Sequence, residues 1–105
     1  MDTTSELLDA LSDPRRRRVV YALADSEDRL SVDDLAQIVA DNETGRADPA
    51  RVDRIHLTLV HNHLRRLADA GFLQYDEERE TVAATSTSPE VETLVDAVRT
   101  LDATT

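Results

Sequence analysis

Apolar residues recur with the spacing of a helix in the middle of the chain. Val60, Leu64 and Leu67 form one apolar stripe, and Gly71 stands where a left-handed residue can end the helix. Asp48-Pro49 carries the N-cap and first-position signals of a helix start. The pattern predicts a long helix over residues 49–70. Its face opposite the stripe is available to a partner and carries Thr58, His61, Asn62, Arg65 and Arg66.

Three shorter helices are predicted upstream of the long one. The first begins at the capping-box spacing of residues 3–6, and the second begins at Asp13-Pro14 and carries four consecutive arginines, residues 15–18. At most two of these arginines can share a helix face, so we expect most to be solvated or paired with nearby acids; the alternative is that one or two of them contact a phosphate. Residues 29–32 can form a short strand, after which Ser31 caps a third helix. By its composition, the segment 41–48 is predicted to be a loop.

A hairpin and a last helix are predicted downstream. Residues 72–75 and 81–84 read as strands around a charged tip of four acids and one arginine, residues 76–80. Ser88-Pro89 then starts a helix over residues 88–102 whose stripe is too apolar for an exposed helix. It either returns to its own core or pairs with the same helix of a second subunit, through Val91, Leu94, Val95, Val98 and Leu101. The fold class expected is mainly α with a small β-hairpin (α+β), as a single domain over residues 1–105.

The charge pattern singles out the long helix. The chain holds 22 acids against 12 basic residues, every one of them arginine, for a net charge of −10. A chain with no lysine and more aspartate than glutamate resembles proteins of salt-loving archaea, whose hydrated anionic surface concentrated salt screens. Residues 49–69 hold four arginines and two acids, a net +2, whereas residues 1–48 and 70–105 each carry −6. We therefore expect the partner of the long helix to be negatively charged.

Several classes of protein are disfavoured. No cysteine is present, no apolar run approaches the length of a membrane span, and the first residues contain no secretory signal, so we expect no membrane association and a cytoplasmic location. No catalytic or cofactor-binding motif is found, and we expect neither enzyme activity nor a cofactor. The three histidines lack a carboxylate or cysteine at ligand spacing, so a metal site is not expected at His56, His61 and His63.

The order of these elements resembles the winged helix-turn-helix transcriptional regulators, in particular the ArsR-like group. The similar segments are residues 8–14 (LDALSDP) with the two arginines after them, 19–23 (VVYAL), 30–36 (LSVDDLA) and 60–73 (VHNHLRRLADAGFL). The chain is also similar to small haloarchaeal winged-helix proteins of unknown function. The resemblance implies that the long helix, around residues 54–66, lies in the major groove of double-stranded DNA and that the hairpin is the wing. The residues then expected to contact DNA are Arg54, Thr58, His61, Asn62, Arg65 and Arg66.

The resemblance also implies a homodimer, which would present two such helices to a palindromic site. Leu57 and Leu59 stand where polar side chains are expected on a DNA-reading helix, so we expect them to pack under the loop or on another subunit. The acidic tip would repel DNA unless salt screened it. The alternative is a protein-protein interaction module on a winged-helix scaffold that no longer contacts DNA and docks a partner through these leucines and the last helix.

Overall fold

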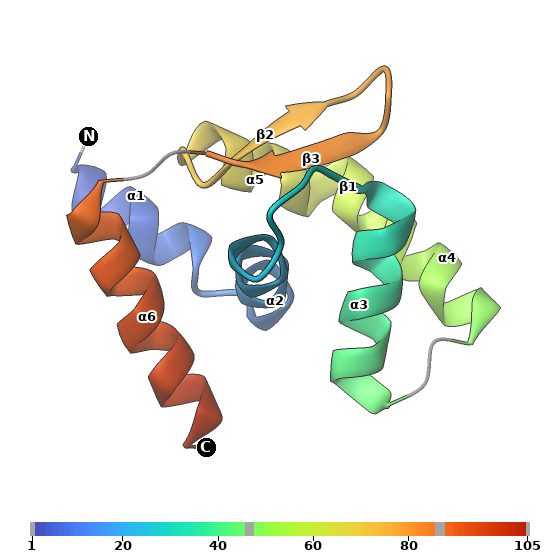
Figure 1. Ribbon diagram of the computed structural model, residues 1–105, viewed down its shortest axis with the longest axis horizontal. Helices are drawn as coiled ribbons and strands as arrows, with labels where there is room; N and C mark the ends of the chain where they lie inside the picture. Colours follow the sequence, from blue (N-terminus) through green and yellow to red (C-terminus); the bar gives the residue numbers. More distant parts are fainter. Residues whose placement is uncertain (1, 46–47, 86–87, 105) are drawn as a thin grey trace.

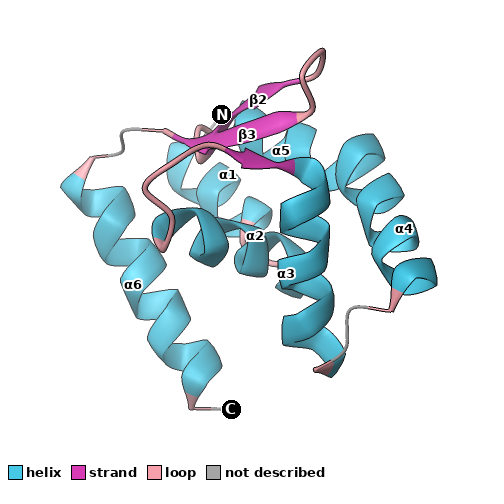
Figure 2. Ribbon diagram, turned by 45° about the vertical axis from the view of Figure 1, so that its right-hand side comes forward, coloured by secondary structure: helices cyan, strands magenta, loops and turns pink. Residues whose placement is uncertain are grey.

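The chain folds into a mainly helical α+β structure with a small antiparallel sheet (Figure 1). The computed structural model describes residues 2–45, 48–85 and 88–104. In chain order the elements are α1 (Thr3–Ala10), α2 (Pro14–Ala24), β1 (Leu30–Ser31), α3 (Val32–Thr44), α4 (Pro49–Thr58), the π-helical turn η1 (Leu59–His63), α5 (Leu64–Asp69), β2 (Leu73–Asp76), β3 (Thr81–Ala84) and α6 (Pro89–Ala103). In both views α4 and α6 lie at opposite sides of the molecule (Figures 1 and 2).

The helix starts follow the local signals in the sequence. Asp13, Ser31, Asp48 and Ser88 each accept a hydrogen bond from a backbone N–H in the first turn of the helix they precede, as predicted. The capping box predicted at residues 3–6 is wrong, because Asp2 caps α1 and Thr3 is already helical. The signal was therefore displaced by one residue.

The sheet has three strands, the two of the predicted hairpin and the short strand predicted within residues 29–32. β2 and β3 pair antiparallel as predicted, with Tyr75 opposite Val82. The two-residue strand β1 pairs with the other edge of β3, with Leu30 opposite Val82, so the order is β1-β3-β2. The sheet thereby ties the start of α3 to the hairpin.

The core lies between the sheet and the helices and is almost entirely aliphatic. Phe72 is its one buried aromatic residue among those described. The largest fully buried side chains come from α2, α3, β3 and the long helix, and are Val19, Val32, Leu35, Val39, Ile55, Leu59, Leu64, Leu67 and Val82.

The predicted loop over residues 41–48 is wrong in its first half. α3 continues to Thr44 and ends at Gly45, whose positive φ of 74° suits a glycine at a helix end. Glu43 is held by a bidentate contact from Arg15, at 2.7 and 2.9 Å. This contact and the burial of Val39 and Ala40 outweigh the loop-like composition, so only residues 45–48 connect α3 to α4.

The long helix over residues 49–69 contains a π-helical turn that its apolar spacing does not indicate. The N–H of Leu64 bonds to the carbonyl of Leu59, five residues back, instead of four. The wider turn shifts the buried side of the helix. Leu59 and His63 are buried together with Leu64 and Leu67, whereas Val60 of the predicted stripe is only half-buried.

The arginines of α2 supply the C-terminal end of α1 with hydrogen-bond donors. Arg16 donates to the carbonyls of Ala10 at 2.6 Å and Asp9 at 3.2 Å, and Arg17 donates to that of Leu11 at 2.8 Å. The last carbonyls of a helix lack partners within it and carry partial negative charge, which cations stabilise. The expectation that most of these arginines are solvated or paired with acids is confirmed, because Arg15, Arg17 and Arg18 each lie within ion-pair distance of a carboxylate. Arg16 is the exception and is only 6% exposed.

The last helix packs along its own chain. Val91, Leu94, Val95 and Val98 are half-buried against the core, whereas Leu101 is 64% exposed. Two ion pairs also hold α6 to α2 and the turn after it, Arg17 to Asp102 at 2.9 Å and Arg99 to Asp25 at 2.6 Å. Most of the apolar stripe is thus used within the chain.

Candidate nucleic-acid interface

The outer face of the long helix, meaning its exposed side over residues 53–66, stands at one edge of the molecule. Five of the six residues predicted to contact DNA are exposed there, and Thr58 is half-buried. Arg54, His61 and Asn62 make no side-chain hydrogen bond or ion pair within the described part of the chain. Thr58 donates its hydroxyl to the carbonyl of Arg54 at 3.0 Å. The side chains most available to a partner are therefore those of Arg54, His61 and Asn62.

The two remaining arginines are held by carboxylates from different elements. Arg65 lies 2.8 Å from Glu77 in the hairpin, and Arg66 lies 3.1 Å from Asp9 in α1. Both pairs are exposed, so each adds little to stability, on the order of 0–1 kcal/mol. Arg65 and Arg66 are therefore already paired, whereas Arg54 has no such partner among the described residues. Either arginine can exchange its carboxylate for another anion at small cost.

His56 joins three elements next to the outer face. Its Nδ1 lies 2.6 Å from Asp33, in the first turn of α3, and its Nε2 lies 3.3 Å from Glu80, at the end of the hairpin tip. Burial lowers the pKa of His56, but the hydrogen bonds to Asp33 and Glu80 outweigh it, so the pKa lies above its ordinary value of 6.5. The protonated imidazole thus connects α3, the long helix and the hairpin. The sequence carries no pattern that predicts this contact.

His63 has the opposite environment, inside the molecule. It is buried in the π-helical turn, and its Nδ1 lies 3.5 Å from the guanidinium of Arg16. Burial lowers the pKa of His63, and the nearby arginines lower it further against the attraction of Asp13. The neutral imidazole can accept the hydrogen bond of Arg16.

Opposite pH dependences are expected for these two histidines. In an NMR titration the midpoint of His56 should lie above 6.5 and that of His63 below 6.5. The raised pKa of His56 stabilises the fold fully below about pH 6.5, and this contribution is lost as the pH rises through the folded pKa. His63 contributes above about pH 6.5, and its contribution is lost as the pH falls towards its lower folded pKa.

Substitution of Asp33 by asparagine separates the two effects. Asp33→Asn should lower the midpoint of His56 and leave that of His63 unchanged, since Asp33 contacts only the former. A midpoint of His56 below that of His63 in the unsubstituted protein would contradict the assigned contacts.

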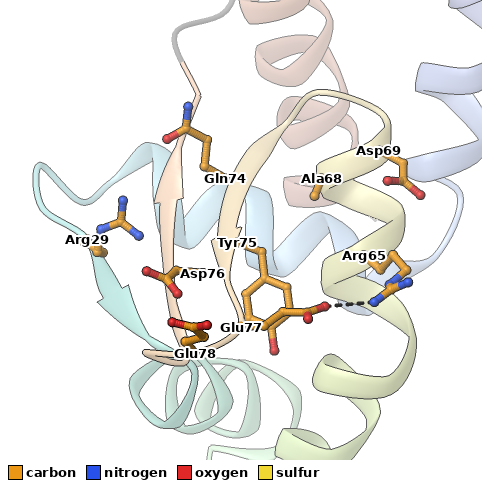
Figure 3. Close-up of a pocket in the computed structure, with 9 residues that line it drawn as sticks. All are labelled: Arg29, Arg65, Ala68, Asp69, Gln74, Tyr75, Asp76, Glu77 and Glu78. Atoms are coloured by element: carbon orange, nitrogen blue, oxygen red, sulfur yellow. Dashed lines mark hydrogen bonds and ion pairs between the residues drawn. The ribbon is translucent and has the colours of Figure 1, made fainter.

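An open depression of about 630 Å³ lies beside the long helix, between α5 and the hairpin (Figure 3). Arg65 and Glu77 meet across it, and burial together with Glu77 and Glu80 raises the pKa of Tyr75 in its wall. The lining has four acids against two arginines: Arg29, Arg65, Ala68, Asp69, Gln74, Tyr75, Asp76, Glu77 and Glu78. This side of the helix therefore does not attract a polyanion by charge.

Leu57 and Leu59, the two leucines at positions expected to be polar on a DNA-reading helix, differ in burial. Leu59 is fully buried in the core of its own chain, so the expected packing on another subunit is wrong for this residue. Leu57 is 57% exposed and lies on the outer face, so it does not pack under the loop; the other expectation, packing on a second subunit, stays a prediction. Ordinary helical spacing explains the difference, because Leu59 follows the buried Ile55 by four residues on the same face, whereas Leu57 is two residues from each and lies on the other side.

The described residues contain no group of three or more histidines and carboxylates placed to hold a metal ion. Among the same residues, no helix combines the length and the apolar character needed to cross a membrane.

Comparison with known proteins gives one match. A family model described as a domain of unknown function, DUF7344, matches residues 8–83, from α1 to β3. No curated protein and no solved structure matches the chain.

Proposed function

We propose that this chain, which belongs to the DUF7344 family, is a DNA-binding transcriptional regulator that reads double-stranded DNA with the outer face of its long helix. The observation that carries the proposal is the exposure of Arg54, His61 and Asn62, whose side chains have no partner among the described residues, on a helix segment (residues 49–69) with a net charge of +2. A helix fits the major groove of B-DNA, where arginine can pair with guanine and asparagine with adenine.

The arrangement of the neighbouring elements supports a winged helix-turn-helix. α3 packs against α4, and residues 45–48 form a connection as short as that of a compact helix-turn-helix. The hairpin stands beside the long helix and would be the wing (Figure 2). In this proposal α3 supports the long helix, which enters the major groove.

A homodimer belongs to the same proposal. Leu101 and the partly exposed edge of α6 supply an apolar surface on the side of the molecule away from α4 (Figure 1). A two-fold pair formed through α6 would leave both long helices available for a palindromic site.

One observation favours the alternative, a protein-interaction module without DNA contact. The hairpin tip is acidic and its carboxylates pair with Arg65 and His56, as if the helix were already neutralised. In that case Leu57 would dock on a protein partner. The experiment below distinguishes the two functions.

The test is a selection of bound sequences from a random pool of double-stranded DNA, at low and at molar potassium chloride. The unsubstituted protein should enrich a related set of sequences. Arg54→Ala/Asn62→Ala should weaken binding to that set at least about tenfold, because each bidentate base contact contributes about 1–3 kcal/mol.

The matched control is Arg18→Ala, which removes one arginine from α2, outside the outer face. Its binding should stay close to that of the unsubstituted protein. If the folded protein enriches no sequence at either salt concentration, DNA reading is refuted and the interaction module becomes the better account.

A further inference from the structure

Leu57 occupies the middle of the outer face and does not belong to the core formed by the described residues. Its side chain is 57% exposed, whereas Ile55 and Leu59 on either side of it are at most 1% exposed. Arg54 lies one helical turn before it, and both His61 and Asn62 lie one turn after it, because the π-helical turn widens that spacing. A leucine therefore stands among the exposed polar side chains proposed to read DNA.

Among the described residues, no other exposed large apolar side chain lies on the long helix. The other exposed large apolar side chains of the described chain are Leu8 in α1 and Leu101 in α6, away from α4 (Figure 1). Docking on a protein normally uses a contiguous apolar surface of several hundred Å². A single leucine between polar residues suits a target that also presents single apolar groups between polar ones.

We propose that Leu57 recognises the 5-methyl group of thymine in the major groove, and so sets a preference for sites with thymine at that position. This inference rests on the proposed DNA-binding function and names what one residue of that face would read. Thymine is the one base whose major-groove edge carries a methyl group. Neighbouring guanine and adenine bases present the groups with which arginine and asparagine can pair.

The charge of the protein makes such a contact useful. Arg65 and Arg66 are held by carboxylates, and the chain has a net charge of −10, so Coulomb attraction to phosphates is weak. Salt weakens phosphate contacts further, whereas it does not screen apolar contacts. Contact with a methyl group adds affinity and specificity that persist at high salt.

The test compares the same DNA with and without its thymine methyl groups. Sequences enriched by the unsubstituted protein are amplified once with thymidine triphosphate and once with deoxyuridine triphosphate, which changes only the 5-methyl group. The unsubstituted protein should bind the thymine form at least about threefold more tightly, from loss of roughly one buried methyl group. The ratio should be maintained in molar potassium chloride.

Two variants decide whether Leu57 is responsible. Leu57→Ala should bind the two forms nearly equally, and Leu101→Ala, which shortens an exposed leucine of α6, should keep the full ratio. Equal binding of both forms by the unsubstituted protein, or an unchanged ratio in Leu57→Ala, would overturn the proposal while DNA binding itself stood. Absence of any enriched sequence would refute DNA binding instead, and this proposal with it.

Discussion

Replacement of Arg16 by alanine is expected to lower the free energy of unfolding by about 3 kcal/mol, a larger effect than at any other arginine discussed above. Arg16 is buried, and its guanidinium bonds to the carbonyls of Ala10 and Asp9 and to the Nδ1 of His63. The substitution leaves a buried carbonyl of Ala10 and a buried imidazole without their donor. Urea unfolding in molar potassium chloride, where the repulsion between acids is screened, measures the difference.

The control for this prediction is Arg18→Ala in the same helix. Arg18 lies 3.7 Å from Glu43 and is partly exposed, so its loss should cost less than about 1 kcal/mol. Arg16→Lys keeps the charge but cannot reproduce the planar set of donors, and should fall between the two. Equal stability of Arg16→Ala and Arg18→Ala would show that the buried hydrogen bonds of Arg16 contribute no more than an exposed ion pair.

The elements that the sequence predicts well depend on neighbouring residues. Asp13-Pro14, Ser31, Asp48-Pro49 and Ser88-Pro89 each begin a helix, because a side-chain cap and a fixed proline φ act within one turn. The hairpin is confirmed for a similar reason, since two short apolar strands flank a polar tip. Gly71 likewise adopts the predicted positive φ, 89°.

The features that could not be predicted depend on residues far apart in the chain. Glu43 stays helical because Arg15, 28 residues before it, holds its carboxylate. Arg16 is buried because its side chain reaches the C-terminal end of α1. No local sequence pattern distinguishes it from the other three of the four consecutive arginines. The π-helical turn could not be predicted from the sequence either, since it depends on how Leu59 and His63 pack in the core.

The same division applies to the candidate interface. Helical spacing correctly places Arg54, His61 and Asn62 on an exposed side, as it does Arg65 and Arg66. It does not reveal that Glu77 and Asp9 hold the last two, or that His56 lies between Asp33 and Glu80. Which cations are available to DNA therefore depends on the tertiary structure, and the assignment of a DNA-binding role stays a proposal.

Removal of the two hairpin carboxylates that pair with the long helix should strengthen DNA binding about tenfold. Glu77 and Glu80 hold Arg65 and His56, and a DNA phosphate must displace or lie beside them. In Glu77→Gln/Glu80→Gln, Arg65 can turn to a phosphate without breaking an ion pair, and two negative charges next to the DNA are lost. An exposed pair contributes about 0.2–1 kcal/mol, so both changes together reach the roughly 1.4 kcal/mol of a tenfold gain.

Binding of the enriched sequences at several salt concentrations measures this gain and its origin. It should shrink as potassium chloride rises, because screening already weakens the carboxylates in the unsubstituted protein. Glu90→Gln/Glu92→Gln makes the same change of net charge on α6, at the opposite side of the molecule from α4, and should leave affinity nearly unchanged (Figure 1). An equal gain in both variants would show that only the net charge matters. No gain in either would show that the hairpin does not compete with DNA for the helix.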